Sequence, residues 1–327
     1  MLSLLPWIGL FCLGYLIIFF SADVFLDNLK ELCTMYKVSP FIIGLLVLGI
    51  DPEESIASIV AAMNGLPHIA VGNVIGNSII ALTLCFALPA FFYKIEIESV
   101  PQFYFNLIYT CMIFILFGFL IYLGLFIFGI LALFLYVIYV FRNFSHFAKK
   151  EITQIIVKNN PEEIQEKTES IGRIRKLEKV SLVVVSFIFI FLGGELLIFA
   201  TQELMIITKI PESFFGFVII AFVTNVEELT LVFKSIKKQT VEIGFGGMIG
   251  KLIWNLTLTF GVSGIISMNI NFAWILIWNW IILLIIVIYF NFISKKKLIN
   301  FKDGIILMVL FSTFIGINLF TIGLFYR

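Results

Sequence analysis

Two short acidic stretches lie within long apolar runs, and they contain the residues best suited to chemistry. The first is residues 49–54 (GIDPEE) and the second is residues 223–228 (VTNVEE). A charge at membrane depth costs about 2.5–3.5 kcal/mol on insertion scales, so such residues are functional candidates. Carboxylate, carbonyl and amide oxygens are the ligands that hard cations such as calcium prefer. The two stretches therefore predict a buried cation site.

The four glutamates of these stretches are expected to have different roles. Adjacent residues on a helix differ in direction by about 100°, so Glu53 and Glu54 cannot point along one line, and neither can Glu227 and Glu228. We expect Glu54 and Glu228 to ligate the cation. Glu53 and Glu227 would carry coupling protons or form an ion pair with Lys251. The alternative is that these acids are paired structural residues.

Further oxygen donors surround the two acidic stretches. Pro52 lacks a backbone donor and predicts a break or kink, whose free carbonyls would enrich the site in oxygen. The additional predicted cation ligands are Asp51, Asn225, Asn77 and Asn255. The predicted supporting residues are Thr224, Ser78, Gly72, Gly76, Gly246, Gly250 and Pro52. Glycines four residues apart also allow close helix packing, which is the alternative explanation for them.

Lys251 is the one basic residue placed inside an apolar run. It is expected to act as a tethered cation that occupies the place of a transported sodium ion. The alternative is that its side chain extends to the cytoplasmic surface. Repulsion between buried acids would keep some of them protonated in an empty site, and calcium would displace those protons. This competition is the physical basis of calcium/proton exchange.

The composition explains where these residues must lie. Hydrophobic residues make up 61% of the 327 residues and charged residues only 13%, whereas soluble domains are about half apolar and a quarter charged. Soluble enzymes and nucleic-acid binders are therefore excluded. A membrane helix needs about 20 apolar residues, and ten such spans can be drawn. They are 5–26, 39–63, 68–92, 102–123, 124–142, 179–202, 213–235, 241–267, 272–293 and 302–325.

An internal repeat relates the two halves of the chain. Residues 54–86 align without a gap on residues 228–260, with ten identities that include Glu54 with Glu228. Each half has five predicted spans, so the second copy would enter the membrane from the opposite side. Such inverted repeats are typical of transporters with a site at the bilayer midplane. The predicted fold is an all-α membrane protein of ten helices in two inverted repeats of five; a duplicated scaffold without transport is the alternative.

The basic residues predict the orientation. With both termini outside, 19 Lys and Arg residues lie in cytoplasmic loops and 2 lie outside, as the positive-inside rule requires. Residues 1–141 would form the first repeat, residues 142–178 a charged and solvated cytoplasmic linker, and residues 179–327 the second repeat. The expected location is the plasma or inner membrane.

These motifs resemble those of the calcium/cation antiporter superfamily, the sodium/calcium exchangers and their proton-coupled relatives. That family has two inverted repeats, each with a Gly-Thr-Ser-x-Pro-Glu type motif followed by Gly-Asn-x-x-Gly-Ser-Asn. Here the corresponding segments are 49–54 with 72–78, and 223–228 with 246–252. The resemblance covers almost the whole chain and implies ten helices, with Glu54 and Glu228 as the paired calcium carboxylates.

The departures from the family pattern concern the coupling ion. Asp51 and Asn225 replace serines of the sodium-coupled branch, and Lys251 replaces a small hydroxyl or amide residue. Glu53 and Glu227 stand where that branch has proline. The Asn-x-x-Glu spacing at 225–228 is closer to the proton-coupled branch.

The sequence thus predicts an antiporter that exports calcium or a related divalent cation by alternating access, in exchange for protons or sodium, with protons preferred. No cofactor is expected besides the transported ions. The expected partners are the lipid bilayer and cations, not nucleic acid, and a monomer is compatible with the sequence. An uncoupled channel or uniporter and a non-transporting sensor are the alternatives. An enzyme is not expected, because HExxH and GxSxG motifs are absent.

Overall fold

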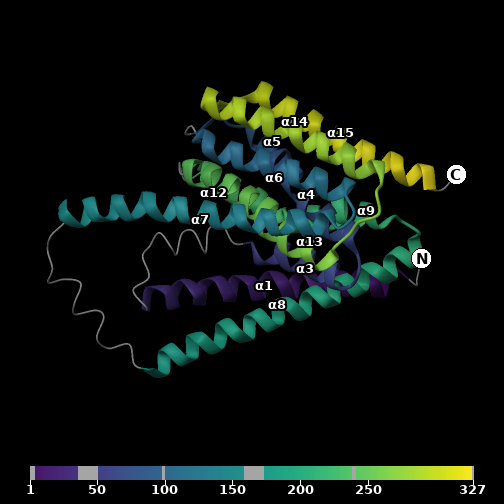
Figure 1. Ribbon diagram of the computed structural model, residues 1–327, viewed down its shortest axis with the longest axis horizontal. Coiled ribbons are helices and arrows are strands. Elements are labelled where there is room, and N and C mark those ends of the chain that lie inside the picture. The colour runs from purple at the N-terminus through teal and green to yellow at the C-terminus, as the bar shows by residue number, and fades with distance from the viewer. Residues whose placement is uncertain (1–3, 36–50, 98–99, 158–172, 238–240, 326–327) are drawn as a thin grey trace.

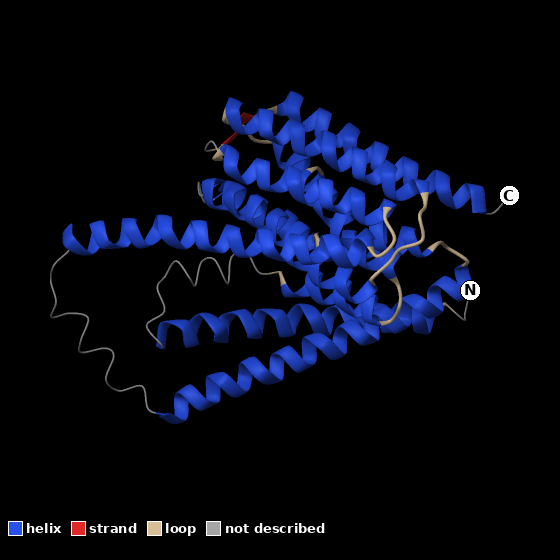
Figure 2. Ribbon diagram, in the orientation of Figure 1, coloured by secondary structure: helices blue, strands red, loops and turns tan. Residues whose placement is uncertain are grey.

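The chain is almost entirely helical in the computed structural model, which describes residues 4–35, 51–97, 100–157, 173–237 and 241–325 (Figures 1 and 2). The elements of the first half are α1 (Leu5–Met35), α3 (Pro52–Met63), α4 (Pro67–Leu82), α5 (Leu84–Ala90), β1 (Ile95–Glu96), α6 (Gln102–Leu120) and α7 (Gly124–Val157). Those of the second half are α8 (Arg173–Thr208), α9 (Glu212–Phe214), η1 (Phe215–Ile220), α10 (Ala221–Thr224), α11 (Val226–Lys237), α12 (Val241–Trp254), η2 (Asn255–Thr259), α13 (Phe260–Ser267), α14 (Trp274–Lys296), β2 (Leu298–Ile299) and α15 (Phe301–Phe325). The segments η1 and η2 are π-helical.

Within these ranges, eight helical stretches are long and apolar enough to cross a membrane. The predicted spans 39–63 and 213–235 are not among the eight. Residues 39–50 lie outside the described ranges, and the described part of that span begins at Pro52. The span 213–235 is divided, because α10 ends at Thr224 and α11 begins at Val226. In the described residues, the first acidic stretch therefore lies at the start of the short helix α3 and the second lies around the boundary between α10 and α11.

The helices that carry the polar residues lie at the centre of the bundle. In the apolar window of α4 and α5, 94% of the residues are buried, against 17% in the window of α15. Helix α4 contacts α3, η1, α13 and α14, and Figure 1 shows it enclosed by its neighbours. The outer helices expose apolar side chains such as Phe134 and Phe320, as expected of surfaces that face lipid tails.

Helices α1 and α8 pack along each other at one side of the bundle (Figure 1). Glycine allows their backbones to approach closely: a methyl group at Gly14 would lie 2.7 Å from the Leu197 nitrogen and 3.0 Å from the Gly193 oxygen. Small residues at such contacts are typical of membrane helix pairs. Helix α8 also contacts α3, so this pair borders one of the short helices.

A second close contact joins the two halves at the centre. A methyl group at Gly72 would lie 3.0 Å from the backbone nitrogen of Phe217, and one at Gly76 would overlap the Phe217 carbonyl. Helix α4 therefore lies directly against the η1 backbone. The packing role expected of these two glycines is thus visible here.

Part of the predicted charged linker 142–178 is helical in the described residues, and residues 158–172 lie outside them. Helix α7 continues to Val157 and α8 begins at Arg173, and Figure 1 shows α7 extending well beyond the bundle. Lysine, glutamate and alanine are good helix formers, so a charged composition does not end a helix.

Candidate functional site

The first side of the site is the N-terminus of α3. Asp51 is the N-cap residue, and its Oδ1 accepts a hydrogen bond from the Glu54 backbone N–H at 3.2 Å. Pro52 occupies the first helical position, where its missing N–H costs nothing. Asp51 and Glu54 are three residues apart, which places them on the same face of the chain. Both are buried, with exposed fractions of 8% and 1%.

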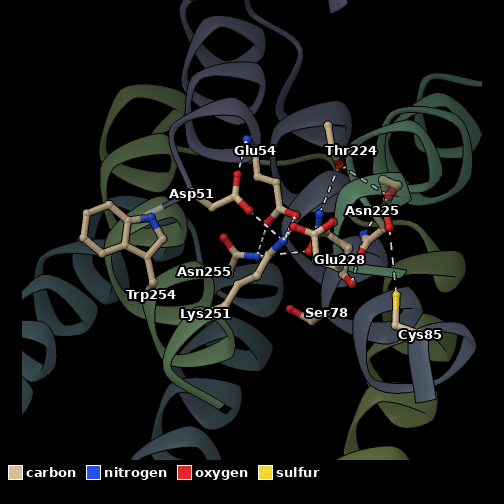
Figure 3. A network of polar contacts seen from close by, with 12 residues as sticks. Asp51, Glu54, Ser78, Cys85, Thr224, Asn225, Glu228, Lys251, Trp254 and Asn255 are labelled. Atoms are coloured by element: carbon tan, nitrogen blue, oxygen red, sulfur yellow. Dashed lines mark hydrogen bonds and ion pairs between the residues drawn. The ribbon is translucent and has the colours of Figure 1, made fainter. Parts of the chain in front are cut away.

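The second side is the interruption between α10 and α11 at Asn225. The Asn225 Nδ2 donates to the Ala221 carbonyl at 2.8 Å and to the Asn77 carbonyl at 3.4 Å. Glu228 follows three residues later, as Glu54 follows Asp51. The interruption thus places an amide and a carboxylate opposite the start of α3 (Figure 3).

Lys251 of α12 lies between these two sides. Its Nζ is 2.6 Å from Asp51 Oδ2 and 2.5 Å from Glu54 Oε1, and it also forms an ion pair with Glu228 Oε1 (Figure 3). The residue is only 7% exposed, so the alternative in which it extends to the surface is wrong. One ammonium group therefore joins three carboxylates that come from the starts of α3 and α11.

The expected pairing of Lys251 with Glu53 is corrected by this geometry. Lys251 forms its ion pairs with Asp51, Glu54 and Glu228 rather than with Glu53, because Glu53 points about 100° away from Glu54 on the helix. Glu53 is nevertheless buried. The side chain of Glu227 lies outside the described part of the chain.

A chain of amides also connects the two sides of the site. Asn255 Nδ2 donates to Glu54 Oε2 at 2.6 Å and to Asn77 Oδ1 at 3.2 Å. Asn77 Nδ2 in turn donates to the Thr224 hydroxyl at 3.1 Å. The structure thus brings together the predicted residues Asn77, Asn255 and Thr224 in one network with Glu54.

The remaining predicted residues lie close by with weaker links to the network. The Ser78 hydroxyl donates to the Val74 carbonyl at 2.7 Å, and Figure 3 includes this residue in the view of the site. Among the described residues, nothing lies within 4 Å of a methyl group placed at Gly246, and one at Gly250 would meet only the Tyr139 hydroxyl at 3.7 Å. These two glycines therefore do not repeat the tight packing of their counterparts in α4.

Several polar residues of the site were not singled out by the sequence. The Ser55 hydroxyl lies 2.8 Å from the Thr259 hydroxyl and accepts a hydrogen bond from Trp254 Nε1 at 2.8 Å. Asn73 Nδ2 donates to the Glu54 carbonyl at 3.1 Å and to the Ser58 hydroxyl at 2.9 Å. Their common signal is that each is a polar or indole side chain within an apolar run of the sequence, and Asn73 lies inside the quoted motif 72–78.

The arrangement is suited to holding a hard cation. Oxygen atoms of Asp51, Glu54 and Glu228 lie within 4.8 Å of one another, and all three residues are buried. Among the described residues, Glu228 Oε2 and Asn225 Oδ1 are buried oxygens without a hydrogen-bond donor. Buried acceptors usually have partners, so these oxygens are suitable for a cation. A buried carboxylate site between interrupted helices of a multi-span bundle is characteristic of an ion transporter.

Comparison with known proteins agrees with this class. Residues 6–145 and 179–320 match the family model for the sodium/calcium exchanger protein, and the chain belongs to that family. It is therefore a multi-pass membrane cation antiporter and not an enzyme. The resemblance inferred from the motifs is confirmed.

Two relatives share most of the length of the chain. An uncharacterized membrane protein of Methanocaldococcus jannaschii is 25% identical over 250 residues, which cover 75% of this chain and 77% of the relative. The inner membrane protein YrbG of Escherichia coli is 25% identical over 272 residues, which cover 79% of each chain.

The fold is similar to solved structures of the sodium-calcium exchanger NCX_Mj. With the structure soaked in 10 mM Na⁺ and zero Ca²⁺, the TM-score is 0.57 at 21% identity, covering 96% of this chain and 99% of that one. With the structure soaked in 10 mM Na⁺ and 10 mM Sr²⁺, the TM-score is again 0.57 at 21% identity. At this identity the similarity concerns the fold alone.

Proposed function

We propose that the protein exports calcium, or a related divalent cation, by alternating access in exchange for a monovalent cation. The observation that carries the proposal is the position of the Lys251 ammonium among Asp51, Glu54 and Glu228. The ammonium occupies the place proposed for a transported cation, because its positive charge is held by carboxylate oxygens. A divalent cation would bind Glu54 and Glu228 directly.

The proposed ligands offer the oxygen chemistry that calcium requires. Besides the two glutamates, Asp51 and the amides Asn77, Asn225 and Asn255 lie in the same network. Calcium takes six to eight oxygen ligands in flexible geometry, and Glu228 Oε2 and Asn225 Oδ1 are buried acceptors that it would satisfy. Glu53 and Glu227 are proposed to carry coupling protons outside the ligand set.

We propose ten membrane helices arranged as two inverted repeats of five. Helix bounds support the repeat: α3 covers 52–63 and α11 covers 226–237, so both ends differ by 174 residues, the offset between Glu54 and Glu228. An odd number of spans in each half reverses the second copy. Both termini would lie outside a plasma or inner membrane, with the segment between α7 and α8 in the cytoplasm.

Protons are the proposed coupling ion in preference to sodium. Lys251 fills a position where sodium-coupled relatives carry a small hydroxyl or amide residue, and its ammonium occupies the space between the carboxylates. The Lys251 ammonium fills space between the carboxylates and compensates part of their negative charge. Less space and less negative charge are then left for a second transported cation. Carboxylates can instead be neutralised by protons, which need no additional space.

Calcium flux in proteoliposomes tests the proposal. Purified protein in phosphatidylethanolamine–phosphatidylglycerol vesicles is expected to accumulate calcium when a proton gradient is imposed, and not when a sodium gradient alone is imposed. Flux driven by sodium alone would contradict the proposed coupling. Steady downhill flux without a counter-ion would favour a uniporter, and absence of both flux and calcium binding would favour a sensor. The control is the variant Glu54→Gln, for which no flux is expected.

A further inference from the structure

Two charged residues of the site differ from their repeat partners in compensating ways. Asp51 corresponds to Asn225, and Lys251 corresponds to Asn77, at the same offset of 174 residues. In each pair one repeat has an amide and the other has a charge. The two changes have opposite signs, so together they leave the total charge of the site unchanged.

The two unmatched charges are in direct contact. Lys251 Nζ lies 2.6 Å from Asp51 Oδ2, and each side chain is only 9% exposed. Asp51 is also held by its role as N-cap of α3, and Lys251 by the helical segment of α12. An ion pair that is buried in this way is costly to separate, because each partner would leave an uncompensated charge.

The charge balance of the site follows from its members. Asp51, Glu54 and Glu228 contribute three negative charges, and Lys251 contributes one positive charge, which leaves −2. In the described part of the chain, Asp51, Glu54 and Glu228 are the carboxylates whose oxygens lie within 4.8 Å of one another. Glu53 is not a member of that group. One divalent cation, or two monovalent ones, would neutralise the site.

We propose that the Asp51–Lys251 pair is a permanent internal counter-ion that makes transport electroneutral, with one divalent cation exchanged for two monovalent charges. This inference rests on the proposed function. When the divalent cation binds Glu54 and Glu228, Lys251 leaves these carboxylates and keeps its contact with Asp51. When the divalent cation departs, two monovalent charges, protons under the proposed coupling, cross in its place. Two positive charges cross in each direction, and no net charge moves.

The charge balance predicts opposite electrical behaviour for the two single substitutions. Lys251→Asn leaves a site of −3, which three monovalent charges would neutralise, so one net charge moves against calcium in each cycle. Asp51→Asn leaves a site of −1, so one net charge moves with calcium. The double variant D51N/K251N restores −2 and the repeat-symmetric amides. It is expected to be electroneutral again.

The experiment measures the equilibrium calcium gradient in proteoliposomes at a fixed proton gradient, with the membrane potential set by potassium and valinomycin. One net charge per cycle shifts this gradient by about 50-fold for about 100 mV. The unmodified protein and the double variant are expected to show no shift. The two single variants are expected to show shifts of opposite sign.

The matched control is Lys209→Asn. Lys209 is exposed and has a positive φ of 57°, a conformation that asparagine tolerates, so the substitution changes a lysine without touching the site. A potential-dependent gradient in the unmodified protein, or in the double variant, would overturn the proposal. The double variant provides this test even where a single variant does not fold. Absence of gradient-driven calcium transport in the unmodified protein would instead contradict the proposed function itself.

Discussion

Gly76 of α4 lies so close to Phe217 of η1 that a methyl group on Gly76 would overlap the Phe217 carbonyl. Among the described residues, its repeat counterpart Gly250 has no such neighbour, because the nearest atom of another element to a methyl group there is the Tyr139 hydroxyl at 3.7 Å. The two glycines occupy equivalent places in the sequence but not in the packing. Of these two glycines, Gly76 makes the tight contact, at the point where α4 crosses the π-helical segment before Asn225.

Gly76→Ala is expected to destabilise the protein or displace η1, since neither backbone can yield without moving a helix. Overpacking of this kind costs about 1–3 kcal/mol. Gly250→Ala is the matched control and is expected to be neutral or slightly stabilising, because alanine favours a helix by about 1 kcal/mol over glycine. The measurement is the melting temperature in detergent. Equal losses for the two variants would contradict the asymmetry of the contact.

Glu54→Gln is expected to lower calcium affinity by at least about tenfold, or about 1.4 kcal/mol. The substitution keeps the size of the side chain and removes a charge that contacts Lys251 at 2.5 Å. Glu228→Gln is expected to behave similarly, since Glu228 also pairs with Lys251. The readout is the rise in melting temperature on addition of calcium. Glu96→Gln, at an exposed position of β1, is the control, and an unchanged calcium response in Glu54→Gln would remove Glu54 from the ligand set.

Trp254→Phe is expected to reduce stability by about 1 kcal/mol, because it removes the hydrogen bond from Nε1 to the Ser55 hydroxyl. The ring contact with Tyr136 would be kept, since phenylalanine retains an aromatic face. Ser55→Ala removes the same bond from the other side, together with the contact to Thr259. A double-mutant cycle measures the coupling. Additive effects of the two substitutions would show that the bond contributes nothing.

The position of the site could be predicted from the sequence because charges are rare in apolar spans. Glu54 and Glu228 recur in matched segments at one offset, and the cost of burying two such glutamates marks them as functional candidates. The structure brings Asn77, Asn255 and Thr224 into the same network.

Repeat symmetry could not indicate Asp51, Glu54 and Glu228 as the partners of Lys251. Asp51 and Glu54 are three residues apart and share a face, whereas Glu53 points elsewhere. The interruption at Asn225 had no proline to indicate it. It becomes visible only in the structure, where the Asn225 side chain bonds to the Ala221 carbonyl.

Asn255→Asp is expected to destabilise the protein in the absence of divalent cations and to increase its response to them. Asn255 Nδ2 donates to Glu54 Oε2 at 2.6 Å, so a carboxylate there would replace a hydrogen bond with repulsion between like charges. Bound calcium would remove the repulsion and gain a ligand. We expect a lower melting temperature without calcium and a larger rise when calcium is added.

A buried amide away from the site is the control for this prediction. Asn279 of α14 is fully buried and exchanges hydrogen bonds with Asn318 of α15 at 3.2 and 2.8 Å. Asn279→Asp also places a carboxylate among apolar helices, so it is expected to lower the melting temperature by a similar mechanism. Calcium should not restore the melting temperature of this variant, because the partner in that contact is the amide Asn318 and not an acid. Restoration of both variants by calcium would indicate a non-specific effect of the ion, whereas restoration of Asn255→Asp alone would place the cation beside Glu54.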